Sequence, residues 1–428
     1  MNCRPNLKSL FTLAFLCYPL SSALAQTTLS PTDHCRDFST DAIVTFADQD
    51  LANVVNDTLG LAVQAALTCG QAAELEQLIV GTTIERVVYG GTLRPSPENP
   101  FESLDGIQNL TGLTRLNLIN RLITDISPLR TLTNLVTLNL HTNWFSDLSP
   151  VSELINLEQL VVSENPISDI SSLAGLTKLR RLHVHGLYPY QLQHYLDMDD
   201  GRDPKVIFNG ITDLSPLAGL TEMRLLRIHL NAISDISPLA NLTKLTHLRI
   251  YESEIKDISP LANLNELILL WANNNQIEDI SALRGMTNMQ QLSLNDNAIS
   301  EVSALQDMVE LGYLFLSNNS IEDIAPLRRL HTLRVLRLEN NDITDVSALA
   351  GLNQLKELSL ARNWSLYNVQ ALLLNQGIGE GDELDLRFTY VPCSDMNAFA
   401  NLGVTLLRVT SINGSACDGR RLEDDQGF

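Results

Sequence analysis

A 22-residue period is the feature of this sequence that most constrains its fold. It is clearest in Leu135-Val-Thr-Leu138-Asn-Leu140-His-Thr-Asn143, where leucines alternate with other residues ahead of an asparagine. The same asparagine returns at multiples of 22 residues, at Asn165, Asn209, Asn231, Asn275, Asn297, Asn319, Asn341 and Asn363. A unit this short cannot bury its apolar face alone, so the period predicts units that stack into an elongated solenoid.

The spacing within each unit is that of a leucine-rich repeat, with one short strand and one return segment per turn. Leu138, Leu140 and Phe145 are expected to point inward and to stack on their equivalents in the next turn. The asparagine stands where the chain leaves the strand, and its amide can pair backbone groups that a turning coil leaves unpaired. The predicted fold class is α/β: a curved horseshoe with a parallel concave sheet and short 3-10 or helical convex segments.

Acidic residues and Ser-Pro pairs mark the return segments. Ser-Pro at positions such as 127–128 and 149–150 predicts a helical turn with serine as N-cap and proline at the first position. Just ahead of these turns lie Asp125, Asp147, Asp169, Asp213, Asp235, Asp257, Asp279, Glu301, Asp323 and Asp345. A calcium ladder is one interpretation of this column. A structural role is favoured, because carboxylates stabilise the starts of short helices.

Composition and motifs exclude several classes of function. The formal net charge of −21 argues against nucleic acid or an anionic membrane as the general partner. Neither G-x-S-x-G nor H-E-x-x-H occurs, so we expect neither an enzyme nor a zinc hydrolase. The G-x-G-x-G of Gly377, Gly379 and Gly381 lacks the strand and helix context of a dinucleotide site. No cofactor is expected.

The N-terminus predicts export. Residues 1–25 combine Arg4 and Lys8, an apolar run and Ala23-Leu-Ala25, as a secretory signal peptide does. No later stretch is long enough to span a membrane, and no Leu-Pro-x-Thr-Gly sorting motif follows. We therefore expect a secreted or periplasmic protein. Four cysteines remain after cleavage, and the simplest of their three pairings joins Cys35 to Cys69 and Cys393 to Cys417.

The sequence resembles the internalin-like bacterial leucine-rich-repeat proteins. The segment from Thr45 to Val55 is similar to their helical N-terminal cap, and Ser103-Leu-Asp-Gly106-Ile107-Gln-Asn-Leu110 is similar to their first return segment. The expected organisation is a signal peptide (1–25), an N-terminal cap (26–103), leucine-rich repeats (104–380) and a disulfide-stapled C-terminal cap (381–428). Within the N-terminal cap, a second helix is expected over 71–78 and a first strand over 83–89. A C-terminal helix is expected near 395–402.

Two segments depart from the repeat. After Val184 the next strand is predicted at 205–208, with Gly201 and Pro204 in place of leucines. Between them, residues 190–196 are expected to form a helix, and Asp197, Asp199 and Asp203 have some of the look of a calcium loop. Their spacing does not fit an EF-hand, so a solvated turn is favoured. A second helix is expected from Tyr367 to Leu374.

Outward side chains of stacked strands should form columns on the concave face, with neighbours about 4.8 Å apart. The central column is predicted to run Asn117, Asn139, Val161, His183, Lys205, Arg227, Arg249, Trp271, Ser293, Phe315, Arg337 and Ser359. Core packing gives no reason to place aromatic and cationic residues there, and such residues mark binding surfaces. The candidate ligand-binding residues are His183, His185, Lys205, Arg227, His229, His247, Arg249, Tyr251, Trp271, Tyr313, Phe315 and Arg337.

These columns favour a recognition protein whose concave face binds an acidic protein partner, as the internalin-like resemblance also implies for protein ligands in general. A binder of acidic glycans or other cell-surface polymers is the alternative, since the same arginines and aromatics would serve. Solvation of the sheet with no ligand is the simplest competing interpretation. Metal binding by His183, His185 and His229 is a further one, and only Asp203 offers them a carboxylate. No metal is therefore expected.

Overall fold

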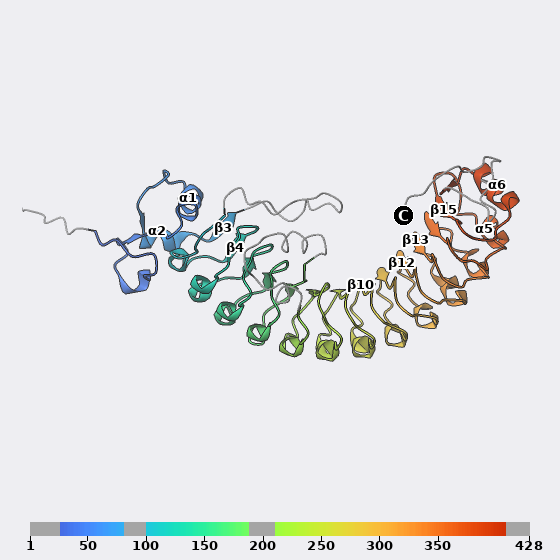
Figure 1. The fold of residues 1–428 in the computed structure, drawn as a ribbon, viewed down its shortest axis with the longest axis horizontal. Helices are drawn as coiled ribbons and strands as arrows, with labels where there is room; N and C mark the ends of the chain where they lie inside the picture. Colours follow the sequence, from blue (N-terminus) through green and yellow to red (C-terminus); the bar gives the residue numbers. More distant parts are fainter. Residues whose placement is uncertain (1–25, 81–99, 188–209, 408–428) are drawn as a thin grey trace, which may run out of the picture.

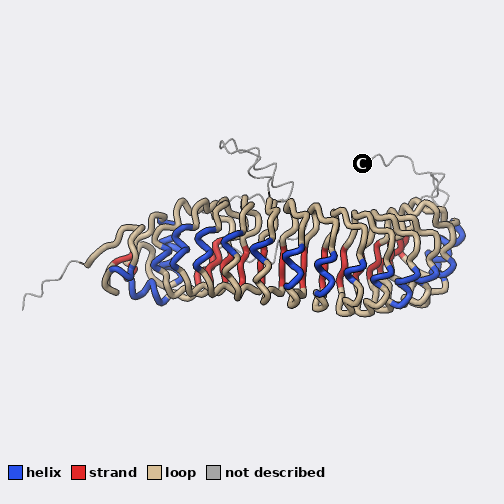
Figure 2. Tube along the Cα trace, turned by 90° about the horizontal axis from the view of Figure 1, so that it is seen from below, coloured by secondary structure: helices blue, strands red, loops and turns tan. Residues whose placement is uncertain are grey.

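The chain forms a curved solenoid with its sheet on the inner side. The computed structural model describes residues 26–80, 100–187 and 210–407. In Figure 1 the strands line the concave upper side of the arc, while short helices follow one another along the convex lower side. Figure 2 views this convex side, where the helices cross in front of the strands. The leucine-rich-repeat fold expected from the period is confirmed.

Among the described residues, fourteen strands form one continuous parallel sheet, and two more form a small antiparallel pair in the N-terminal cap. The strands are β1 (Ile43–Val44), β2 (Leu67–Thr68), β3 (Gln77–Val80), β4 (Arg115–Leu118), β5 (Thr137–Asn139), β6 (Gln159–Val161), β7 (Arg181–His183), β8 (Leu225–Arg227), β9 (His247–Arg249), β10 (Leu269–Trp271), β11 (Gln291–Ser293), β12 (Tyr313–Phe315), β13 (Val335–Arg337), β14 (Glu357–Ser359), β15 (Glu383–Asp385) and β16 (Thr405–Leu406).

The helices are short and lie in the caps and on the convex side. The α-helices are α1 (Gln49–Thr58), α2 (Cys69–Glu74), α5 (Gln370–Leu373) and α6 (Cys393–Asn401). The 3-10 helices are η1 (Cys35–Asp37), η3 (Ile107–Asn109), η4 (Ser127–Thr131), η5 (Ser149–Glu153), η6 (Ser171–Leu173), η7 (Ser215–Leu217), η8 (Ser237–Asn241), η9 (Ser259–Asn263), η10 (Ser281–Leu283), η11 (Ser303–Leu305), η12 (Ala325–Arg329) and η13 (Ser347–Leu349).

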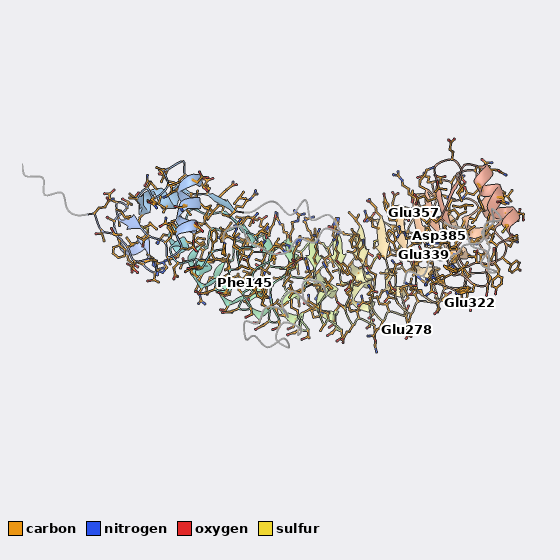
Figure 3. The ribbon with its side chains drawn as sticks, turned by 45° about the horizontal axis from the view of Figure 1, so that its top comes forward. Phe145, Glu278, Glu322, Glu339, Glu357 and Asp385 are labelled. Atoms are coloured by element: carbon orange, nitrogen blue, oxygen red, sulfur yellow. A yellow bond between two sulfur atoms is a disulfide. The ribbon has the colours of Figure 1, made fainter. Side chains whose placement is uncertain are left out.

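Leucine columns form the core between sheet and convex segments. Leu248, Leu270 and Leu292 are aligned in neighbouring strands and fully buried. Phe145, labelled in Figure 3, is buried in the same layer near the N-terminal end. Because every second strand residue faces this core, the residues between them must face the concave side.

The asparagine ladder has the predicted structural role. The amide nitrogen of Asn143 donates to the carbonyls of Leu118 (2.8 Å) and Leu140 (2.9 Å), and its oxygen accepts from the N–H of Ile123 (3.1 Å). Asn363 repeats this arrangement at the other end of the solenoid. Both side chains are fully buried. Each asparagine therefore joins its own turn to the preceding one through backbone groups that would otherwise be unpaired.

The convex turns differ from prediction in which residue caps them. Ile126, not Ser127, occupies the N-cap of η4, and no serine side chain caps it. Instead, Asp125 accepts from the Ser127 N–H (2.8 Å) and the Ser127 hydroxyl (2.8 Å). The same pair of bonds recurs at Asp257 and Ser259. The structural interpretation of the acidic column is thus confirmed at these aspartates, because both carboxylate oxygens are already used, but the expectation of serine as N-cap is wrong.

The N-terminal cap is built around α1 and a disulfide. Asp48 caps α1 by accepting from the Leu51 N–H (2.9 Å), and a bond joins Cys35 to Cys69 as predicted. The expected helix over 71–78 is too long, because α2 ends at Glu74 and residues 77–80 form β3, which pairs with β4. Residues 83–89, where a first strand was predicted, lie outside the described residues, as does the predicted signal peptide.

The C-terminal cap contains the expected helix, α6, beside α5 and the last strands. Cys393 at the start of α6 takes part in a disulfide. Cys417, its expected partner, lies outside the described residues.

The largest error of the sequence analysis concerns residues 188–209, which lie outside the described residues. A strand at 205–208 was predicted to separate His183 from Arg227, but β7 pairs directly with β8 and sets these two residues side by side. The amide of Asn231 likewise reaches back 47 residues to Val184, where Asn275 reaches back 25 to Ile250. The difference, 47 − 25 = 22, is one whole repeat length. Gly201 and Pro204 explain the failure, since neither supplies the inward leucine that a strand here must bury.

Candidate concave binding face

Strand register brings most of the predicted site residues together. Along the central column, His183 neighbours Arg227, Arg227 neighbours Arg249, and Arg249 neighbours Trp271. The column continues through Ser293 to Phe315 and Arg337. Lys205 has no place between His183 and Arg227, and its position lies outside the described residues. We define the central concave face by eight residues. His183, Arg227, His247, Arg249 and Trp271 lie on strands β7 to β10, and His185, His229 and Tyr251 lie two positions after the last residues of β7, β8 and β9.

Three rings of this face stack on one another along the sheet. His185 stacks on His229 with centroids 4.2 Å apart, and His229 stacks on Tyr251 at 4.1 Å, with interplanar angles of 18° and 21°. Equivalent positions of adjacent strands lie close enough for rings in one column to stack face to face. The stacked rings cover one another, so His229 is 2% exposed and Tyr251 is 7% exposed. The prediction that these two side chains are exposed is wrong; they support their neighbours.

The histidines are neutral near pH 7. Burial and then the nearby Arg227 lower the pKa of His183 from 6.5 to about 2. Burial and then His141 lower the pKa of His185 to about 3. The pKa of His229 is lowered by burial, then by His185 and Arg249, and that of His247 by partial burial and then by Arg249. Among the described residues of this face, positive charge therefore comes from arginine.

We expect the free energy of unfolding to fall between pH 7 and pH 5. An unfolded histidine takes up a proton near pH 6.5, whereas His185 stays neutral down to about pH 3. The unfolded chain binds more protons in this window, so stability rises with pH from about 3 to 6.5 and is level above. Each such histidine contributes at most about 1.4 kcal/mol to the change in the free energy of unfolding per pH unit.

Urea unfolding at pH 5 and pH 7 measures this effect. The His185→Gln variant, which keeps a planar polar side chain without the titration, should lose less stability on acidification than the wild type. Equal losses in the two proteins would contradict the assignment of His185 as a buried neutral base.

Arg249 and Trp271 form the most defined contact of the face. The Arg249 guanidinium carbon lies 4.0 Å from the centroid of the Trp271 ring, within cation–π range. The indole Nε1–H of Trp271 is covered and has no hydrogen-bond acceptor among the described residues. Within the described ranges, no carboxylate forms an ion pair with Arg249. The pair thus presents an arginine charge held in place by a ring.

Charge divides the concave face into two parts. The outward positions of β7 to β11 are Arg181, His183, Leu225, Arg227, His247, Arg249, Leu269, Trp271, Gln291 and Ser293. None of these residues is acidic, although the chain has 50 Asp and Glu and only 29 Lys and Arg. Toward the C-terminal end the face becomes acidic, and Figure 3 shows Glu339, Glu357 and Asp385 gathered there.

Tyr313, Phe315 and Arg337 lie on the acidic side of this boundary. Tyr313 is 39% exposed, and the Arg337 guanidinium lies 5.8 Å from the Phe315 ring. Arg337 also pairs with Glu357, whose carboxylate accepts from Arg337 Nε at 2.7 Å. Sequence reasoning missed this neutralisation, although Glu357 stands one strand further on in an adjacent column. Arg181 is exposed at the edge of the basic part, and it extends the arginine row by one strand.

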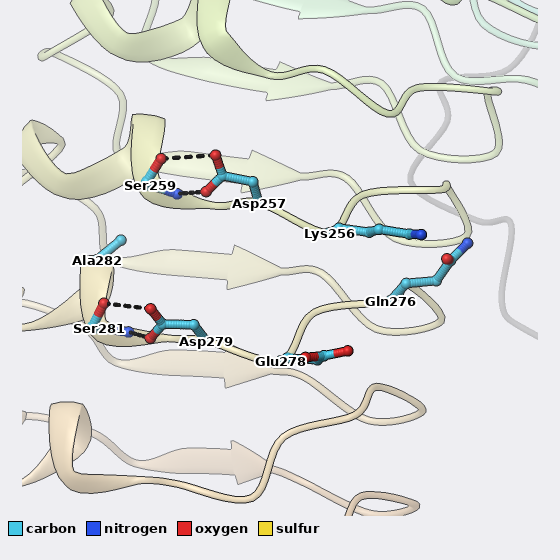
Figure 4. A pocket seen from close by; sticks show the side chains of 8 residues that line it. All are labelled: Lys256, Asp257, Ser259, Gln276, Glu278, Asp279, Ser281 and Ala282. Carbon is cyan, nitrogen blue, oxygen red and sulfur yellow. Dashed lines mark hydrogen bonds between the residues drawn. The ribbon is translucent and has the colours of Figure 1, made fainter.

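A depression of about 330 Å³ lies away from this face, between two convex turns. Figure 4 shows that Asp257 and Asp279 bind Ser259 and Ser281 rather than point into it. The Ser259 backbone N–H, followed by its hydroxyl, lowers the pKa of Asp257. The carboxylates of Asp257 and Asp279 are therefore structural.

Within the described ranges, no group of three or more His, Cys, Asp or Glu is arranged to hold a metal ion. In the same part of the chain, no helix is both long and apolar enough to cross a membrane.

Comparison with known proteins identifies relatives with this architecture. A family model of leucine-rich repeats in two copies matches residues 111–153, 265–307 and 287–329. The solved structure of an internalin, InlF, from Listeria monocytogenes is 30% identical, covers 84% of this chain and 95% of that chain, and has a TM-score of 0.70. No curated protein matches the sequence.

Two further solved structures share the fold at lower identity. A leucine-rich-repeat protein of Leptospira interrogans is 18% identical over 79% of this chain and 91% of that one, with a TM-score of 0.56. The functional domain of InlJ from Listeria monocytogenes is also 18% identical, over 85% of this chain and 69% of that one, with a TM-score of 0.52. At this identity the likeness concerns the fold alone.

Proposed function

The chain belongs to the internalin-like leucine-rich-repeat proteins, and on this premise we propose that it is an exported, non-enzymatic recognition protein whose central concave face binds an acidic protein partner. The fold is consistent with protein binding. The observation that carries the proposal is the arginine row Arg227 and Arg249 beside Trp271, on strands that project no carboxylate.

Electrostatics supports an acidic partner. The protein as a whole is strongly acidic, with a formal net charge of −21, so a general attraction of anions is absent. The outward arginines of β7 to β9 reverse that sign locally, where the histidines contribute no charge near pH 7. A local field of one sign steers a complementary partner and repels others.

The side-chain types support a protein ligand. Tryptophan, tyrosine and arginine dominate the binding energy of protein interfaces because they bury large areas with few rotatable bonds. Trp271 is backed by Arg249 on one side and lies 6.3 Å from the Tyr251 ring, centroid to centroid. The stacked rings of His185, His229 and Tyr251 fix the base of this face, so fewer side chains have to become ordered on binding.

A capture experiment tests the proposal. The wild-type protein is immobilised and exposed to envelope fractions and to the surroundings of the source organism, beside a Trp271→Ala/Arg249→Ala variant. A Val309→Ala/Arg328→Ala variant serves as the matched control, because it removes an exposed apolar side chain and an arginine from the convex side. We expect the wild type and the control to capture the same protein and the concave variant to lose it. Capture of the same material by all three would refute the concave site.

Salt dependence then measures the electrostatic part. The association rate of the captured partner should fall about tenfold between about 0.05 and 0.5 M salt, because screening removes the steering by the arginines. The Arg249→Ala variant should show a shallower dependence. A rate that does not change with salt would contradict an acidic partner.

An acidic glycan or other cell-surface polymer is the second candidate, because the arginine row would also bind its anionic groups. Such a ligand would bind with a steep salt dependence and tolerate Trp271→Ala, whereas a protein partner would not. The predicted signal peptide and the Cys35–Cys69 disulfide support export, since disulfides persist in oxidising compartments.

A further inference from the structure

A second group of exposed rings lies at the C-terminal end of the solenoid, apart from the concave face. Trp364 is 53% exposed, Phe388 is 41% exposed and Tyr390 is 52% exposed. They occupy the turns that follow β14 and β15, and the N–H of Tyr390 donates to the carbonyl of Leu366 at 2.8 Å, which fixes the two turns side by side. The rings of Trp364 and Phe388 lie 5.8 Å apart at an angle of 44°. We call Arg362, Trp364, Phe388 and Tyr390 the edge aromatic group.

The fold does not require rings at these positions. The residue after the ladder position is Glu254, Gln276, Ala298, Ser320 or Asp342 in the five preceding turns, but Trp364 and Tyr390 in these two. Trp144 fills the same slot after Asn143, but it is only 8% exposed. Phe388 occupies a backbone slot with φ of +59°, which Asn274, Asn318 and Asn340 fill in some turns and Thr142, Leu230 and Arg362 in others. Asparagine tolerates this left-handed region better than a bulky residue does. Exposed apolar rings in adjacent turns indicate a contact function.

Charges of both signs lie around the rings. Arg362 lies over the Phe388 ring with 5.6 Å from its guanidinium carbon to the centroid. The neighbouring Arg387 is held by Asp385, with Nη2 and Oδ2 2.7 Å apart. Counted over the adjacent turns, Asp342 offsets the charge of Arg362, and the net charge of −21 of the whole protein disfavours polyanionic ligands and anionic membranes.

Polar side chains continue the edge toward the preceding turns. Asn340 donates to the side-chain oxygen of Asn318 at 3.0 Å, and Asn318 donates to Asp296 at 2.7 Å. Exposed ring faces beside amides, a carboxylate and a guanidinium match a ligand with apolar C–H faces and many hydroxyl groups.

We propose that the edge aromatic group binds a neutral, β-1,4-linked polysaccharide. The flat C–H faces of successive sugar rings lie against Trp364 and Tyr390, because the electron-rich ring face attracts weakly positive C–H groups. Sugar hydroxyls pair with Arg362, Asn340 and Asp342, which offer both donors and acceptors. The extended form of a β-1,4-linked chain suits an open edge that has no enclosing walls.

Calorimetric titration of the full chain with cellohexaose and chitohexaose tests this site. At least one of them should bind, and α-linked maltohexaose and a hexamer of galacturonic acid should bind at least tenfold more weakly. The Trp364→Ala/Tyr390→Ala variant should lose at least tenfold in affinity. Trp271→Ala, on the concave face, should retain full affinity and so separates this site from the proposed protein-binding function.

The Phe388→Asn variant distinguishes a loss of sugar binding at the site from a loss caused by misfolding. Asparagine suits the backbone of this slot, so the Tm should not fall, while removal of the ring beneath Arg362 should weaken oligosaccharide binding at least threefold. Absence of binding to both β-linked probes, tighter binding of the acidic hexamer, or unchanged affinity in the Trp364→Ala/Tyr390→Ala variant would each overturn the proposal. Loss of a protein ligand, instead of a sugar, in that variant would overturn it as well.

Discussion

Asn143→Ala is expected to lower the free energy of unfolding by about 3–6 kcal/mol. The side chain is fully buried, and its removal leaves the carbonyl of Leu118 and the N–H groups of Arg121 and Ile123 without this partner. The Leu140 carbonyl loses one of two donors, because it also accepts from the amide of Asn165 at 3.0 Å. Each unsatisfied buried backbone group costs about 1–3 kcal/mol, and partial access of water to the Arg121 N–H keeps the sum below the maximum. Equilibrium unfolding in urea measures the loss.

Asn134→Ala is the matched control for this prediction. Asn134 is exposed and makes one hydrogen bond, to the carbonyl of Thr111 at 2.9 Å. Water can replace that bond, so its removal should cost less than about 1 kcal/mol. A similar loss of unfolding free energy in the two variants would mean that the asparagine ladder does not join the turns of the solenoid as described.

Trp271→Ala is expected to weaken binding of the captured protein partner by about 2–4 kcal/mol, or roughly 30- to 1,000-fold in Kd. The substitution removes the largest ring of the central concave face and the surface on which the Arg249 guanidinium lies. The dissociation rate should account for most of the change. Surface plasmon resonance with the purified partner separates the two rates.

Tyr313→Ala provides the comparison. Tyr313 is the more exposed ring, but it stands beyond the arginine row near the acidic end of the sheet. Its removal should weaken binding less than Trp271→Ala does. If Tyr313→Ala has the larger effect, the centre of the contact lies toward the C-terminal end, and the argument from the arginine row fails.

Much of the fold could be predicted because the repeat states each structural role many times. Leucines at alternating positions and one asparagine per turn determine the strand register, and the structure places Leu248, Leu270 and Leu292 accordingly. The extra 22 residues between the turns of β7 and β8 could not be recognised from spacing, because their number equals the period. Only Gly201 and Pro204, in place of leucines, indicated that no further strand separates β7 from β8.

Exposure on the concave face was harder to predict than position. Alternation places His229 and Tyr251 on that face, but it cannot show that rings in one column stack at about 4 Å and cover one another. Ion pairs between adjacent columns, such as that of Arg337 with Glu357, could not be predicted from the alternation either. These contacts depend on side-chain conformations, which a periodic pattern does not specify.

The edge aromatic group left a signal that the sequence analysis did not use. Trp364 and Tyr390 follow ladder positions at which the five preceding turns carry Glu254, Gln276, Ala298, Ser320 and Asp342, and a comparison of the turns slot by slot reveals this. Attention to strand positions alone omitted the loops that follow them. Such loops carry function when a rigid scaffold positions them.

Hydroxyl-radical footprinting of the protein with and without its captured partner tests the central claim most directly, because it reports the solvent access of individual side chains. Binding to the central concave face predicts strongly reduced oxidation of Trp271, with a smaller reduction at Tyr313. Oxidation of Trp364 and Tyr367, both exposed near the C-terminal end, should not change. Unchanged oxidation of Trp271 in a saturated complex would contradict the account.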